Sequence, residues 1–313
     1  MNDIASGQRL LAHALRQLIA VVRETRERVV VSETARMTGT VANDDEALHD
    51  FRVALRRTRT LLRVAQILWS SKQILRIERE LRYFARATGT LRDDEVLRST
   101  LASVQTSEAA MDEVRSWLAK RAQRGQAKHR VILRIVREGP TRRDAASEKG
   151  KRIRPLGVVL DKLERLLDKP TKTCSSSELA EVSVENAVNE VRRRARSGVH
   201  DAAAMHSLRI REKRLRYTVE LFADELGEEG RRLVTHATRM QRRLGDLHDF
   251  DEAMTTVMRA RGLTKTTRQA LDDVLRVARA TCAAKVEPHL IEARELDSRF
   301  VLSCNEALPK SST

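Results

Sequence analysis

The chain has 313 residues, of which 41% are hydrophobic and only 3% are aromatic, so its core must be packed mainly with aliphatic side chains. This length allows one large domain or two domains of about 150 residues. Sixty lysines and arginines oppose 44 aspartates and glutamates, and the formal charge of +16 predicts an anionic partner. Of the sixty, 48 are arginine, an excess that suits phosphate recognition but also fits a GC-rich genome.

The composition excludes several classes of protein. Five prolines and twelve glycines leave long uninterrupted segments, and no β-rich runs bounded by turn pairs occur, so we expect an all-α fold. The cysteines Cys174, Cys282 and Cys304 are widely spaced, which argues against a disulfide framework or a zinc site and suits a reducing compartment. We find no signal peptide and no membrane span, so the cytoplasm is the expected location.

Apolar residues at helical spacing predict a series of amphipathic helices. In chain order we expect them at about residues 3–32, 44–69, 72–88, from 93 onward, and at 107–137, 158–167, 178–197, 201–226, 228–244, 247–261 and 265–287. Gly89, Gly245 and Pro288 are expected to stop three of these helices. The acidic run Asp93-Asp94-Glu95 is expected in the first turn of the fourth helix, where negative charge suits the helix dipole.

The segment 141–155 is polar and basic and has no apolar periodicity, so we expect it to be a linker. It would join a first helical bundle, residues 1–140, to a second one, residues 156–300. Residues 301–313 are expected to form a tail.

Two of the predicted helices carry cations along one face and apolar side chains along the other. The first stripe consists of His49, Arg52, Arg56, Arg59 and Arg63, within an arc of roughly 80°. The second stripe consists of His206, Arg209, Lys213 and Arg216. Like charges at i,i+4 destabilise a helix by about 0.2–0.5 kcal/mol per pair. A solvated charged face would explain one such helix, but two at equivalent positions predict a bound anion.

The two stripe helices belong to an internal repeat. The matched positions are His49 and His206, Arg52 and Arg209, Val53 and Ile210, Arg56 and Lys213, Arg57 and Arg214, and Arg59 and Arg216. A second block follows in the same order, because Leu-Arg-Asp after Gly89 corresponds to Leu-His-Asp after Gly245. We therefore expect a duplicated unit of about four helices, giving two pseudo-symmetric four-helix bundles.

Pseudo-symmetric bundles can bring their basic faces together, so we expect the two stripes to line a shared basic groove or pore. Neighbouring helices would add further arginines to its walls. These are Arg82, Arg86, Arg239, Arg242 and Arg243.

The sequence His-Asp-Phe-Arg-Val-Ala-Leu-Arg-Arg-Thr-Arg at 49–59, its copy at 206–217 and Leu-Gly-Asp-Leu-His-Asp at 244–249 resemble the CHAD family, the conserved histidine α-helical domain. The resemblance extends over about residues 7–290. It implies two four-helix bundles around a basic pocket or pore that binds inorganic polyphosphate, and association with intracellular polyphosphate granules. Many relatives also carry a triphosphate-hydrolysing CYTH domain, for which this chain has no room, so no attached enzyme is expected.

The family match also implies which residues contact phosphate. They are His49, Arg52, Arg56, Arg57, Arg59, His206, Arg209, Lys213, Arg214 and Arg216. Arg57 and Arg214 lie off the main arc, so they could instead pair with acids across the bundle. One departure is Thr58 where the second copy has Leu215, which makes the first helix less apolar without touching its stripe.

The histidines and acids of these motifs have alternative interpretations. Neither His49 nor His206 has a second His or Cys at ligand spacing, so we expect hydrogen-bond donors that gain charge beside a polyanion, rather than metal ligands or nucleophiles. The acidic groups at 93–95 and 249–252 could suggest magnesium-assisted chemistry, but their position near helix starts favours a structural role. No Gly-rich phosphate cradle and no nucleophile–base pair is present.

The sequence thus predicts a non-enzymatic polyphosphate-binding protein without a cofactor or metal, possibly with granule-associated protein partners. The alternative is a nucleic-acid-binding protein that uses the same groove. Nine aromatic residues supply few platforms for base stacking, which favours a ligand made only of phosphate. Membrane insertion is not expected, because no helix has bulky apolar residues free to insert.

Overall fold

A computed structural model describes residues 5–38, 44, 46–144, 152–169 and 172–296. Within these ranges every regular element is a helix, which confirms the predicted all-α class. The helices are Ser6–Thr38 (α1), Ala47–Ala65 (α2), Ser71–Ala87 (α3), Gly89–Ala102 (α4), Glu108–Glu138 (α5), Leu156–Leu167 (α6), Ser176–Arg194 (α7), Ala202–Leu221 (α8), Ala223–Met258 (α9) and Lys265–Glu295 (α10).

The helices group into two compact units. The first unit contains residues up to Asp94 and Ala122–Ser175, and the second contains Glu95–Arg121 and residues from Ser176 onward. Helices α4 and α5 therefore each contribute to both units. This grouping follows three-dimensional contacts and differs from the sequence halves 1–140 and 156–300. Residues 145–151 of the segment 141–155, and all of the expected tail 301–313, lie outside the described residues.

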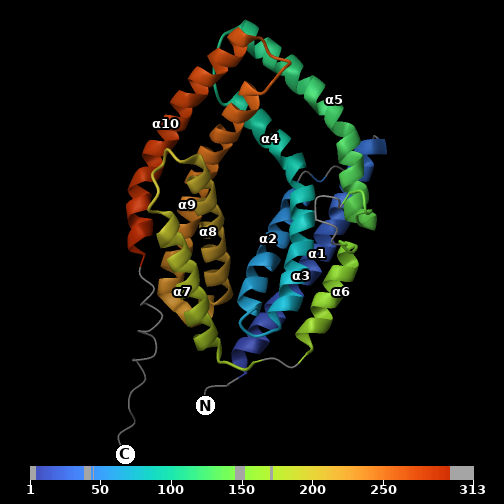
Figure 1. Ribbon diagram of the computed structural model, residues 1–313, viewed down its shortest axis with the longest axis vertical. Coiled ribbons are helices and arrows are strands. Elements are labelled where there is room, and N and C mark those ends of the chain that lie inside the picture. Colours follow the sequence, from blue (N-terminus) through green and yellow to red (C-terminus); the bar gives the residue numbers. More distant parts are fainter. Residues whose placement is uncertain (1–4, 39–43, 45, 145–151, 170–171, 297–313) are drawn as a thin grey trace, which may run out of the picture. The chain divides into compact units, whose positions relative to one another are not determined.

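The first unit is built on α1, α2, α3 and α6. Helix α1 packs on α2, α2 on α3, and α6 contacts both α1 and α3 (Figure 1). The buried side of α2 includes Phe51, Leu55 and Leu62, each fully shielded from solvent. These apolar residues lie opposite the first stripe, so burying them turns the cations of α2 away from the core.

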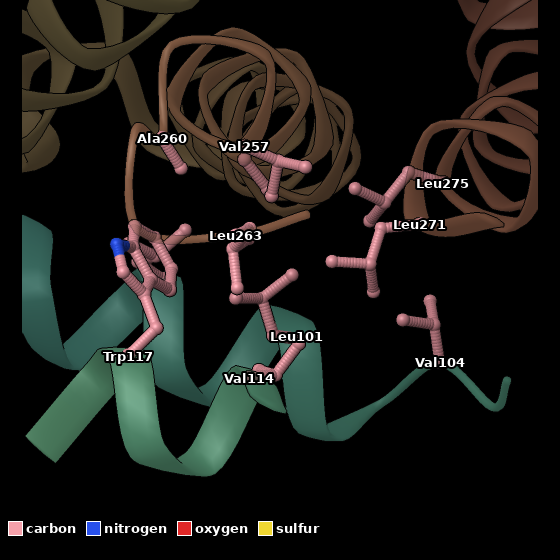
Figure 2. Close-up of a cluster of buried hydrophobic side chains, with 11 residues drawn as sticks. Leu101, Val104, Val114, Trp117, Val257, Ala260, Leu263, Leu271 and Leu275 are labelled. Atoms are coloured by element: carbon pink, nitrogen blue, oxygen red, sulfur yellow. The ribbon is translucent and has the colours of Figure 1, made fainter. Parts of the chain in front are cut away.

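The second unit is built on α7, α8, α9 and α10, with α8 and α10 each packed along α9. A separate apolar cluster joins the end of α4 and the start of α5 to the α9–α10 connection (Figure 2). Trp117 packs there among Leu101, Val257 and Leu271. This cluster is the reason that residues 95–121 belong to the second unit.

Three of the helix boundaries predicted from sequence are wrong. Helix α9 continues through Gly245, because Leu247 and Val257 beyond it are buried and their burial stabilises the longer helix. Helix α10 likewise continues past Pro288 to Glu295 and buries Leu290. In both places, packing outweighs the local preference of a single residue.

The third error concerns the start of α4. This helix begins at Gly89, so the acidic run that follows lies beyond its first turn and not within it. Gly227 marks a real break, since its φ of +53° is left-handed and kinks the chain between α8 and the long part of α9.

Candidate functional site

The first stripe forms a half-buried basic face on α2. Arg52, Arg56, Arg59 and Arg63 are half-buried and His49 is exposed. Among the described residues, Arg56 and His49 have no carboxylate within ion-pair distance. Arg56 therefore offers a guanidinium group that no carboxylate in the described part of the chain neutralises.

Glu78 of α3 pairs with the C-terminal half of the first stripe. Its carboxylate lies 3.0 Å from Arg59 and 3.7 Å from Arg63, and Arg82 also donates to it. Burial opposes ionisation of Glu78, but the hydrogen bond from Arg82 and the charge of Arg59 prevail, and the pKa of Glu78 falls below its usual value. One carboxylate thus faces three guanidinium groups, which leaves a positive excess.

Arg52 lies against the start of α4. A Cβ atom added to Gly89 would be 3.2 Å from Arg52 Nη1, so the absence of a side chain at position 89 makes room for the guanidinium. The second unit has a looser version of this arrangement, in which a Cβ atom on Gly245 would be 3.8 Å from Arg209 Nε. The two arginines and the two glycines are the pairs that the sequence repeat aligns.

The second stripe lies on α8 and faces α9. His206, Arg209, Lys213 and Arg216 are all half-buried. Arg216 donates to Glu220 at 2.7 Å and approaches the side-chain oxygen of Gln241 on α9 at 3.5 Å. Its charge is therefore partly compensated by the chain itself.

His206 is adjacent to His248 of α9. The two Nδ1 atoms are 3.4 Å apart and the ring centroids 4.5 Å apart. Burial, together with the charges of Arg209, His206 and Lys213, lowers the pKa of His248 to about 4. Burial and the same two cations also lower the pKa of His206, against the opposing charge of Glu252. The lowered pKa values favour the neutral form of both imidazoles.

His248 and Glu78 are the two residues of this site that the sequence analysis did not select. His248 lies inside the motif at 244–249, so its place in that motif could have identified it as a site residue. Glu78 carries no comparable signal, because its role depends on which face of α3 meets α2.

The two arginines that lie off the main arc occupy side positions. Arg214 donates to Glu190 of α7 at 3.2 Å, and the neighbouring Arg211 contacts the same carboxylate at 3.1 Å. This is the pairing across the bundle considered for Arg214. Arg57 is half-buried on α2.

The predicted arginines on α9 line a groove beside α10. This groove has a volume of about 580 Å³ and includes Arg239, Arg242, Arg243 and Lys285 in its wall. Arg239 lies 3.7 Å from Glu292, and Arg243 donates to the backbone carbonyl of Lys285. The structure therefore brings these arginines together along α10. On α3, Arg82 joins Glu78, and Arg86 is exposed in the last turn.

The acidic groups considered for magnesium are dispersed. Asp251 pairs with Arg279 of α10. Within the described ranges, no cluster of three or more His, Cys, Asp or Glu side chains is placed to hold a metal ion. In the same part of the chain, no helix combines the length and apolar character needed to cross a bilayer.

Comparison with known proteins identifies the family. The CHAD domain family model matches residues 14–258, which include both stripes and the His206–His248 pair. The chain belongs to the CHAD domain family. Two Mycobacterium tuberculosis proteins, the uncharacterized proteins MT2285 and Rv2226, are each 29% identical to it over 202 residues. Each match covers 61% of this chain but only 37% of the relative, so the chain spans well under half the length of either protein.

Solved structures share the CHAD fold. The CHAD domain from the plant Ricinus communis superposes with a TM-score of 0.57 at 19% identity, and the match covers 99% of this chain and 94% of that one. PptA from Streptomyces chartreusis superposes with a TM-score of 0.53 at 14% identity, covering 93% and 100% respectively. At these identities the likeness concerns the fold alone.

Proposed function

We propose that this CHAD domain binds inorganic polyphosphate through the two stripes on α2 and α8, without catalysing a reaction. The family is associated with polyphosphate binding. The observation that carries the proposal for this chain is the excess of cations along the first stripe, where Glu78 is the one carboxylate, among the described residues, that pairs with Arg59 and Arg63 of the stripe and with Arg82 of α3. An array of guanidinium groups with too few carboxylates matches a chain in which every repeating unit is an anion.

The second stripe supports the same function by a different device. Burial lowers the pKa of His206 and His248, and the charges of Arg209 and Lys213 lower both further, as expected where cations lie close to the imidazoles. A polyanion would relieve that repulsion and recruit two more positive charges. Association with polyphosphate granules in the cytoplasm, and contact with proteins there, are part of this proposal.

The direct test is reversal of charge in both stripes. Arg52, Arg56, Arg209 and Lys213 are replaced together by Glu, and binding of long-chain polyphosphate is measured by titration calorimetry. We expect loss of detectable binding with retained helical circular dichroism, because none of the four side chains is in the core. The matched control reverses Arg142, Arg196, Arg259 and Arg261, which are exposed and lie outside both stripes. Equal losses in the two variants would contradict a specific site.

Reversing one stripe at a time tests whether the two stripes share one groove. If both stripes bind the same polyphosphate chain, reversing Arg52 and Arg56 alone, or Arg209 and Lys213 alone, should remove most of the affinity, and the two losses of binding free energy should not add. If the stripes are independent sites, each reversal should instead remove one binding site and leave the affinity of the other unchanged. Competition by DNA at equal phosphate concentration tests the alternative, since a nucleic-acid-binding protein would prefer DNA. For either polyanion, the logarithm of the association constant should fall linearly with the logarithm of the salt concentration.

A further inference from the structure

Helix α6 of the first unit sorts its charges onto two sides. Its acids face α1, where Arg16 pairs with Asp168 at 2.7 Å and Arg23 pairs with Asp161 and Glu164 at 2.8 and 2.7 Å. These acids are spaced i, i+3, i+7 along the sequence. The bases Lys162 and Arg165, with Lys169 just beyond the end of the helix, have the same spacing but are each shifted by one residue. The acidic and basic side chains of α6 therefore lie on different sides of the helix and face different neighbouring helices.

The basic side of α6 faces α3, and α3 presents more cations there. Helix α6 lies beside both α1 and α3 (Figure 1). A pocket of about 310 Å³ between α3 and α6 is lined by five basic side chains, Arg76, Arg154, Lys162, Arg165 and Lys169. None of these residues belongs to either stripe.

Carboxylates do not balance these cations. Glu80 is fully buried and is held by Arg154, which donates to both of its oxygens. Among the described residues, Arg76, Lys162, Arg165 and Lys169 have no carboxylate within ion-pair distance. The positive charge of Arg154, followed by desolvation and the charge of Arg76, lowers the pKa of Lys162, as expected where cations crowd together.

We propose that the α3–α6 pocket binds a compact oligophosphate group, such as a free triphosphate or the triphosphate of a nucleotide, at a site separate from the stripes. Four cations without carboxylate partners match a ligand that carries three to five negative charges in a small volume. Arg76 and Arg165 supply planar forks for phosphate oxygens, and Lys162 and Lys169 supply point charges. The apolar side chains of Ile77 and Leu166 complete the wall and exclude water from one side.

The site is tested by calorimetric titration of the full chain with tripolyphosphate. The variant with both stripes reversed isolates the pocket, and we expect it to bind one tripolyphosphate per chain. Adding Lys162→Glu and Arg165→Glu should lower that affinity at least about tenfold, since two charge-assisted contacts become repulsive. The control pair Arg259→Glu and Arg261→Glu makes the same change in net charge, at exposed positions of the second unit. It should alter the affinity less than about threefold.

Two further arms identify the ligand chemistry. ATP should bind with an affinity similar to tripolyphosphate, and adenosine should not bind. Binding of ATP without tripolyphosphate would overturn the assignment, as would equal losses in the pocket and control variants. If the glutamate variant does not fold, Lys162→Gln with Arg165→Gln removes the same two charges without repulsion and should still weaken binding severalfold. In a chain with intact stripes, Lys162→Glu with Arg165→Glu removes the pocket, and long-chain polyphosphate binding then reports on the stripes alone, so the two proposals can fail independently.

Discussion

Arg52 Nη1 lies 3.2 Å from the position that a Cβ atom on Gly89 would occupy. The corresponding distance between Gly245 and Arg209 Nε is 3.8 Å, which is an ordinary van der Waals separation. Each of these two glycines thus lies beside an arginine, but only the first glycine is needed for space. This difference allows the two positions to be compared by the same substitution.

The substitution Gly89→Ala should weaken polyphosphate binding severalfold, because the added methyl group displaces the Arg52 guanidinium by a few tenths of an ångström. Gly245→Ala should leave binding unchanged and stabilise α9, by about 0.5–1 kcal/mol, because alanine is the better helix former. Calorimetry and thermal denaturation of both variants make the comparison. Equal affinities would show that Arg52 is not positioned by the start of α4.

Polyphosphate affinity should rise as pH falls from 7 to 5. A bound polyanion raises the pKa of His248 from about 4, so the complex takes up a proton that the free protein does not hold. Each proton taken up can increase affinity by up to about tenfold per pH unit. In His248→Gln this dependence should become shallower, whereas His13→Gln, on the exposed face of α1, should behave as wild type. An unchanged slope in His248→Gln would show that His248 does not take up a proton on binding.

Stability of the second unit should decrease as pH rises above 6.5. Buried His236 lies between Glu212 at 3.4 Å and Glu292 at 3.1 Å, and these carboxylates outweigh burial and raise its pKa above the usual 6.5. A raised histidine pKa gives stability that is complete below 6.5 and is lost as pH passes the folded-state pKa. Burial also raises the pKa of Glu212, which acts in the same direction.

Thermal denaturation at pH 6 and pH 8.5 measures this effect. We expect His236→Gln to be less stable than wild type by about 1–3 kcal/mol at pH 6 and by less at pH 8.5. A constant difference between the two proteins would mean that His236 is not charged in the folded state.

Trp117→Ala should destabilise the second unit by about 3–5 kcal/mol, since it removes the largest side chain of the cluster in Figure 2. Tripolyphosphate binding at the α3–α6 pocket should persist, because the pocket residues and Trp117 belong to different units. Hydrogen exchange can localise the loss of protection. The matched control is Trp69→Ala, which removes the buried tryptophan of the first unit. In that variant the loss of hydrogen-exchange protection should occur in the first unit.

Sequence patterns predicted the stripe helices well, because their apolar and basic residues repeat with a helical period. They failed at Gly245 and Pro288, where a local preference of about 1–3 kcal/mol is overridden by burial of the residues that follow. Pairings between helices could not be predicted. Nothing in the sequence places His248 against His206, because 42 residues separate them and the contact depends on how α9 packs on α8.

The α3–α6 pocket was also beyond sequence analysis, although its ingredients are visible. The alternation of acids and bases along α6 can be read directly from residues 161–169. Whether the acids face α1 or α3 depends on how these two helices pack against α6. Only this packing places Lys162 and Arg165 in the wall of the pocket.

The apolar cluster around Trp117 has a consequence for synthesis of the chain. Its partners Leu263 and Leu271 leave the ribosome some 150 residues later, at about 5–20 residues per second. The tryptophan side chain therefore stays without these partners, and is open to misassociation, for about 8–30 seconds until the C-terminal hairpin emerges. Nascent chains stalled before residue 260 should engage holding chaperones, and those released after α10 should not.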